Sequence, residues 1–246
     1  MSMLRSLLFG ENVRNSSFMR ILGIVLTLGY LLSMLVFLGN CAAKALVWTK
    51  SRSVNEVTSD KITLRTFVMA AGDILFFRRL LIVNDILWIG EWIFHFTFIL
   101  VILRHLRYFL NPVPQWVWAL QTPGIIAGYV LPIALAYIFT VKFLIERKKY
   151  FSTYNFLLLV LILVISISGL LMKTIYHPDI VSVKTFVMGI VTFGFAAVPG
   201  SALFIFHFIL VLALILNLPT HIFAAPLVLI GARQREDNLN QVIHEK

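Results

Sequence analysis

The sequence predicts an all-α integral membrane protein with five transmembrane helices, and three observations support this. Hydrophobic residues make up 60% of the 246-residue chain and charged residues only 13%, about half the charged fraction of an ordinary soluble domain. The mean hydropathy is +0.92, and apolar runs of about 20 residues, the length that crosses a bilayer, recur along the chain. Polar and apolar residues do not alternate in blocks of about ten residues, which argues against a transmembrane β-barrel.

The five apolar runs belong to one predicted membrane domain, residues 1–246. A short polar stretch precedes the first run, and polar segments separate the others. We expect the spans at about residues 21–48, 80–109, 124–145, 156–172 and 201–222, and a cytoplasmic tail over residues 223–246.

The segments between the spans also carry structural signals. Residues 62–79 mix apolar and charged side chains, which is typical of an interfacial helix or of an extension of the second span. In residues 111–118, two prolines end the second span and two tryptophans mark the membrane interface. Pro132 predicts a kink in the third span. Residues 184–193 predict a short surface helix, which the sequence Ala-Val-Pro-Gly at residues 197–200 ends.

Net charge indicates an orientation rather than a nucleic-acid partner. The formal net charge is +10, but the lysines and arginines gather in loops, as the positive-inside rule describes. Fourteen of the 21 fall on the side of the C-terminus. We therefore expect a multi-pass protein of the inner (cytoplasmic) membrane, embedded in the lipid bilayer, with its N-terminus outside, its C-terminus in the cytoplasm and no nucleic-acid partner.

Cysteine content excludes several cofactors. Cys41 is the single cysteine, so the chain forms no intramolecular disulfide and has no motif for covalent haem attachment. An iron–sulfur cluster held by this chain alone is excluded as well, because such clusters need several thiolates.

Four of the six histidines lie in two of the predicted spans: His95 and His105 in the second, His207 and His221 in the fifth. A lone intramembrane histidine often only joins two helices, but two pairs on two helices indicate function. Because these spans run in opposite directions, His95 can face His221 and His105 can face His207. The helical rise from His95 to His105 is about 15 Å and that from His207 to His221 is about 21 Å. This difference requires tilt or a bend, which Pro219 could supply.

Facing imidazoles in a helix bundle suit the two axial positions of a haem iron. Two such pairs at different depths predict a four-histidine dihaem bundle with one haem near each membrane surface. Zinc is disfavoured by the vertical separation and the missing thiolates. A proton relay competes, but acidic residues are lacking in mid-membrane, since Asp85 and Glu91 lie near one end of their span.

Four arginines are candidates to pair with haem propionates: Arg104 and Arg107 beside His105 for the outer haem, and Arg78 and Arg79 for the inner one. The alternative for each is a side chain that only extends to the membrane interface.

These features resemble a known family. The two histidines ten residues apart, followed by a last span that carries His207 and His221-Ile-Phe-Ala-Ala-Pro226, are similar to the gamma subunit of respiratory nitrate reductase, a family of five-span dihaem cytochromes b. The segment from Leu103 to Pro114 is more similar to the membrane cytochrome b of the dissimilatory sulfite reduction (Dsr-type) branch. The last-span gap is about one helical turn shorter than in the family, which keeps both histidines on one face.

The resemblance implies two haem b groups, each with two histidine ligands: His95 and His221 for the inner, His105 and His207 for the outer. It also implies menaquinol or menaquinone as the substrate. The family's quinol-site lysine has no counterpart in residues 115–122. Tyr108, Asp179 and His177 are weaker candidates for contact with the quinone.

The function that follows is electron transfer in a respiratory complex of anaerobic respiration, such as sulfite reduction. Electrons would pass between menaquinol and a cytoplasmic iron–sulfur partner of the heterodisulfide-reductase-like kind, in either direction, and protons would be released outside. The resemblance leaves room for further membrane or periplasmic redox subunits. Two alternatives stay open: a hydrogenase- or formate-dehydrogenase-type cytochrome b anchor, and a non-redox transporter.

Overall fold

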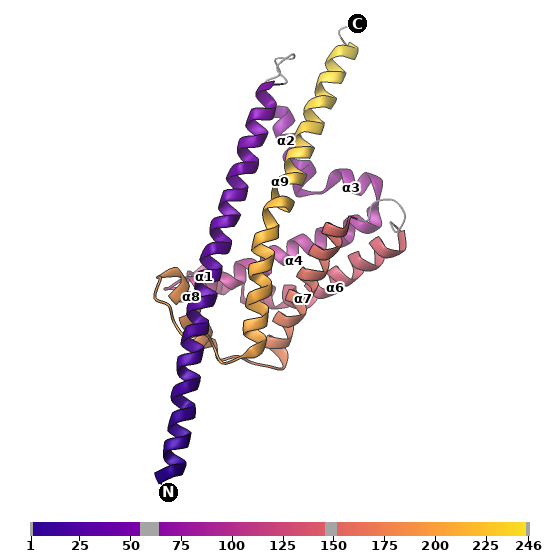
Figure 1. The fold of residues 1–246 in the computed structure, drawn as a ribbon. Coiled ribbons are helices and arrows are strands. Elements are labelled where there is room, and N and C mark those ends of the chain that lie inside the picture. The colour runs from indigo at the N-terminus through magenta and orange to yellow at the C-terminus, as the bar shows by residue number, and fades with distance from the viewer. Residues whose placement is uncertain (1, 55–63, 146–151, 245–246) are drawn as a thin grey trace.

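A computed structural model of the chain describes residues 2–54, 64–145 and 152–244, and within these ranges the regular elements are helices (Figure 1). In chain order they are α1 (Ser2–Val54), α2 (Leu64–Leu75), α3 (Arg78–Val83), α4 (Asp85–Phe109), α5 (Gln115–Ala119), α6 (Gln121–Ile145), α7 (Thr153–Thr174), α8 (Ile180–Val191) and α9 (Ala202–His244).

Five helices in the described part of the chain are long and apolar enough to cross a membrane: α1, α4, α6, α7 and α9. The prediction of an all-helical chain with five long apolar helices is therefore confirmed for the described residues, which is consistent with a multi-pass membrane protein. Large apolar side chains such as Leu32, Leu35 and Ile133 are exposed on the spans, which suits contact with lipid tails.

The second span differs from its predicted bounds because Asn84 interrupts the helix. The span was expected from about residue 80, yet α4 begins at Asp85. Asn84 is extended, its backbone N–H bonds the carbonyl of Leu80, and its side chain accepts from the backbone N–H of Leu87 as the N-cap of α4. The preceding mixed segment forms two separate helices, and Phe77 between them has a left-handed backbone with φ of 48°.

The ends of the chain are also more helical than predicted. In the segment expected to be a short polar stretch, α1 already begins at Ser2, and in the expected tail α9 continues as far as His244. Figure 1 shows the C-terminal parts of α1 and α9 extending beyond the other helices at the same end of the bundle. Neither Pro132 in α6 nor Pro219 in α9 ends its helix.

In the part of the chain that the structure describes, buried side chains form two core clusters. One joins α4, α6, α7 and α9 around Leu135 and Ile138, which are fully buried. Gly90 permits the close approach of α4 to α6, because a Cβ atom there would lie 2.6 Å from the ring of Tyr137. The other cluster joins α1, α8 and α9 around the fully buried Phe186. The short surface helix predicted over residues 184–193 corresponds to α8, which begins four residues earlier. It is not a surface helix on all sides, because one face is buried in this cluster.

Candidate functional site

Both histidines of α4 use one ring nitrogen to bond the backbone of their own helix. The Nδ1 atom of His95 lies 2.7 Å from the carbonyl oxygen of Glu91, and that of His105 lies 2.6 Å from the carbonyl oxygen of Val101. Because a carbonyl oxygen only accepts, each Nδ1 carries the hydrogen and donates it. The Nε2 atom of each neutral ring keeps its lone pair, and this tautomer can bind a metal through Nε2.

His207 of α9 is oriented by a side chain of α7. Its Nδ1 atom lies 2.8 Å from the hydroxyl oxygen of Ser168, and that hydroxyl donates its single hydrogen to the carbonyl oxygen of Ile165 at 2.9 Å. Ser168 therefore accepts from His207, so the Nε2 atom of this ring also keeps its lone pair. Gly169 borders the ring, since a Cβ atom there would lie 3.4 Å from His207 Cε1, in ordinary van der Waals contact.

The ring of His221 from α9 lies close to the ring of His95 from α4. Their centroids are 6.2 Å apart and their planes differ by 15°. Two imidazoles that bind one metal from opposite sides have centroids about 6 Å apart, because each metal–nitrogen bond is about 2 Å long and each ring adds about 1 Å. The observed separation therefore suits one metal atom between the two rings. Phe77 and Phe94 flank His95, with ring centroids 4.7 and 4.6 Å from it.

The backbones of the two helices that carry these rings stay apart, although side chains of both belong to one core cluster. α4 packs mainly against α6 and α8, whereas α9 packs against α1, α2 and α7. Within the described residues, no Cα atoms of α4 and α9 approach within 8 Å. A porphyrin is wide and flat, so its axial ligands come from helices that it holds apart. Among the residues that the structure describes, no three His, Cys, Asp or Glu side chains are grouped to hold a metal ion.

The other predicted pair, His105 with His207, is less complete. His105 is exposed and His207 is partly buried, and the described part of the chain shows no ring contact between them. Each ring nevertheless has its Nδ1 engaged and its Nε2 available. The outer pairing stays a prediction, with both rings already in the tautomer that it requires.

Three predicted cofactor contacts gather at the end of α4 beside His105. The Arg104 Nε atom is buried without a hydrogen-bond partner in the described chain, and the stem of Arg104 packs against Gly124. Arg107 donates to Gln121 Oε1 at 3.1 Å and to the hydroxyl of Tyr108, and its guanidinium lies 4.6 Å from the Tyr108 ring centroid. The unpaired donor of Arg104 could receive an anionic group such as a propionate.

The arginines predicted for the inner haem have different surroundings. Arg78 is exposed. Arg79 belongs to an ionic cluster that the sequence analysis missed, in which the Asp73 side chain is only 1% exposed. Arg233 Nε donates to the Asp73 carboxylate at 2.7 Å, and Arg79 Nε donates to the same carboxylate at 3.3 Å. Arg79 also pairs with Glu236 at 2.9 Å. This cluster, termed here the Asp73 cluster, ties α2 and α3 to the C-terminal part of α9.

A second missed ion pair adjoins the predicted inner ligands. Glu91 Oε1 lies 2.8 Å from Lys142 Nζ of α6, and Glu91 Oε2 lies 3.8 Å from His95 Nδ1. The spacing of four residues between Glu91 and His95 places both on one helical face, a signal that could have identified this contact. Lys142 is 51 residues away along the chain from Glu91, and no local pattern identifies it.

Ser168→Ala is expected to weaken metal or haem binding through His207 by about 10- to 100-fold, because it removes the hydrogen-bond partner that fixes the ring. Titration of haem into the apoprotein in detergent measures this. Ser166→Ala is the matched control, since Ser166 is also buried on α7 but bonds only the backbone of Leu163. Equal affinities of the two variants would contradict a supporting role for Ser168.

The fold defines a class: α-helical proteins with five long apolar helices, consistent with a multi-pass membrane protein, in which His95 and His221 lie close together. The chain is distantly homologous to Hdr-like menaquinol oxidoreductase cytochrome b-like subunits. It is 33% identical to the one from Archaeoglobus profundus over an aligned region of 119 residues. This region covers 44% of this chain and 35% of the relative. It is 30% identical over 119 residues to the one from Archaeoglobus fulgidus, which covers 44% of this chain and 36% of the relative.

The matched region thus spans little more than a third of the length of these curated relatives. No family model matches the chain, and no solved structure matches it at a significant level.

Proposed function

We propose that this chain is a membrane dihaem cytochrome b subunit that transfers electrons between menaquinol and a cytoplasmic iron–sulfur partner. The observation that carries the proposal is the His95–His221 ring pair, 6.2 Å apart and borne by helices whose backbones do not touch. A hydrogen-bonding pair would need its ring nitrogens in contact, whereas a metal-binding pair needs this larger separation.

The residues have the following roles in this proposal. His95 and His221 hold the inner haem b, and His105 and His207 hold the outer one. Glu91 and Ser168 keep the Nδ1 hydrogens of His95 and His207 in place, so that Nε2 points to the metal. A bound haem supplies reversible one-electron transfer at the metal.

Charged side chains receive the propionates. Arg104 and Arg107, with the neighbouring Tyr108, serve the outer haem in this proposal. Arg78 and Arg79 are the candidates for the inner one, and Arg78 is the freer of the two, because Arg79 already pairs with Asp73 and Glu236.

The partner and the location follow from the resemblance and from the names of the relatives. Both relatives are described as subunits of Hdr-like menaquinol oxidoreductases, which supports a heterodisulfide-reductase-like iron–sulfur subunit as the electron acceptor. We place residues 1–246 in the cytoplasmic membrane as one domain, with the N-terminus outside and the partner docked at the C-terminal side. Sulfite reduction is the respiratory process that the Dsr-type resemblance suggests, with further membrane or periplasmic redox subunits in the complex.

Reduction by a quinol tests this function. In lipid vesicles that contain the purified chain, menadiol is expected to reduce the haem. The reduced b-type absorption bands should reach nearly the amplitude that dithionite produces. Reduced b-type bands that appear with dithionite but not with menadiol would contradict the menaquinol step. Durohydroquinone, a benzoquinol with a higher potential, serves as the comparison for quinone type.

A further inference from the structure

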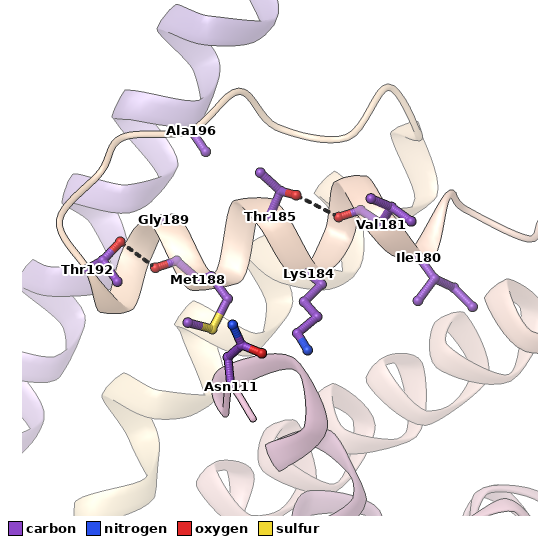
Figure 2. A pocket seen from close by; sticks show the side chains of 9 residues that line it. All are labelled: Asn111, Ile180, Val181, Lys184, Thr185, Met188, Gly189, Thr192 and Ala196. Atoms are coloured by element: carbon purple, nitrogen blue, oxygen red, sulfur yellow. Dashed lines mark hydrogen bonds between the residues drawn. The ribbon is translucent and has the colours of Figure 1, made fainter. Parts of the chain in front are cut away.

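A groove lies between α8 and the segment that follows α4 (Figure 2). It has a volume of about 580 Å³, within the range of ligand pockets in proteins. Its apolar lining comes from Ile180, Val181, Met188 and Ala196, and its polar lining from Asn111, Lys184, Thr185 and Thr192, with Gly189 as the ninth residue.

Two of the four polar side chains are already satisfied. The Thr185 hydroxyl donates to the carbonyl of Val181, and the Thr192 hydroxyl donates to the carbonyl of Met188, each at 2.9 Å, as the dashed lines in Figure 2 mark. Both hydroxyls are thus directed at their own helix. Lys184 and Asn111 remain, and neither side chain has a hydrogen bond or an ion pair within the ranges that the structure describes.

The nearby carboxylate does not neutralise Lys184. Asp179 accepts from the backbone N–H groups of Val181 and Ser182, each at 3.1 Å, and from the hydroxyl of Ser182 at 2.5 Å. These bonds, led by that of the Ser182 hydroxyl, lower the pKa of Asp179 from its ordinary value and hold the carboxylate at the start of α8. The groove therefore presents an ammonium and an amide, both unpaired, among apolar side chains.

The groove adjoins the end of α4 that carries His105. α8 packs against α4, and both Tyr108 and Phe109 pack against the cluster around Phe186 of α8. Gly189 shapes the wall of the groove, because a Cβ atom there would lie 2.9 Å from the Cβ of Ala196.

We propose that this groove binds the head ring of menaquinol or menaquinone, with Lys184 and Asn111 as donors to its two ring oxygens. The inference rests on the proposed function, to which it adds a substrate site. A naphthoquinone ring is flat, apolar and uncharged, and it has one oxygen at each of two opposite positions. A phospholipid phosphate fits less well, because the groove has one cation and a largely apolar lining.

The chemistry at the site balances with the proposed haems. Oxidation of the quinol breaks two O–H bonds, converts two C–O single bonds to carbonyls and releases two electrons and two protons. Two haems held by the four histidines of the proposed function would supply the two one-electron acceptors, and the protons leave to water. Lys184 and Asn111 bind the ring oxygens and are not oxidised or reduced.

Lys184→Met tests the site by two readouts. We expect about a tenfold weaker quenching of tryptophan fluorescence by menadione, and about a tenfold higher KM for menadiol in haem reduction, because one charge-assisted hydrogen bond is lost. Asn111→Leu is expected to act in the same direction, and Lys184→Arg to recover part of the affinity. Lys173→Met is the matched control, because Lys173 is an exposed lysine in the last turn of α7 that does not line the groove.

The outcomes separate this inference from the proposed function. Unchanged menadione affinity in Lys184→Met, with haem absorption equal to that of the unmodified chain, would overturn the groove assignment alone. The same holds if that variant, in detergent, loses only its binding of a short-chain phosphatidylglycerol, because the groove would then be a lipid phosphate site. If the unmodified chain lacks b-type bands, or if menadiol does not reduce its haem, the proposed function itself is contradicted, whatever the variants show.

Discussion

Replacement of His221 with alanine is expected to remove one b-type haem and to leave the other in place. The ring centroid of His221 lies 6.2 Å from that of His95, so in the proposed site its loss would leave the inner haem iron with a single protein ligand. The pyridine haemochrome of the purified variant should contain about half the haem of the unmodified chain. His177→Ala is the control, because His177 is exposed in the segment between α7 and α8 and should keep both haems.

The outer pair gives the complementary result. His207→Ala should also halve the haem content, but the haem that remains should have the redox potential that is missing in His221→Ala. Loss of both haems or of neither, in a variant that elutes as a folded protein, would contradict the assignment of these two residues to separate haems.

Replacement of Asp73 with asparagine is expected to destabilise the protein by about 3 kcal/mol, since it leaves two arginines without their buried partner. The Asp73 side chain is 1% exposed and contacts Arg233 and Arg79 at 2.7 and 3.3 Å. Thermal unfolding in detergent, followed by circular dichroism, measures the change. Glu236→Gln is the control in the same cluster, because Glu236 is 47% exposed and such pairs contribute less than about 1 kcal/mol.

The same carboxylate gives a dependence on pH. The hydrogen bond from Arg233, more than any other contact, lowers the pKa of Asp73 below its ordinary value of 3.8, despite its burial. A carboxyl group whose pKa is lowered in the folded state stabilises that state at pH values above the group's ordinary pKa. This contribution is lost as the pH falls through the lowered pKa. Asp73→Asn should therefore show a smaller loss of stability than the unmodified chain when both are acidified from pH 5 to pH 2. Equal losses would contradict the role of the Asp73 cluster.

The spans and the approach of His95 to His221 could be predicted because their signals are local. Hydropathy and length identify five spans, and the positions of four histidines along two antiparallel helices predict which rings can meet. The break at Asn84 was missed because apolar residues continue on both sides of it, and only the cap reveals where the helix begins. The buried face of α8 was missed for a similar reason, since an apolar segment of that length can lie at an interface or in a core.

The contacts that support the histidines could not be predicted, because they join distant parts of the chain. Ser168 reaches His207 across 39 residues, and Asp73 reaches Arg233 across 160. A serine in an apolar span and an arginine in an apparent tail carry no signal of their partners. Glu91 is the exception, since its position one helical turn before His95 follows from the sequence alone.

The most direct test of the account is the haem content of the purified chain. Expressed in a host that makes haem b and purified in detergent, the chain is predicted to bind two haems b per polypeptide, with reduced-minus-oxidised bands of the b type. A chain that is folded and helical, yet carries no haem after reconstitution with excess haem, would contradict the assignment of His95, His105, His207 and His221 as ligands.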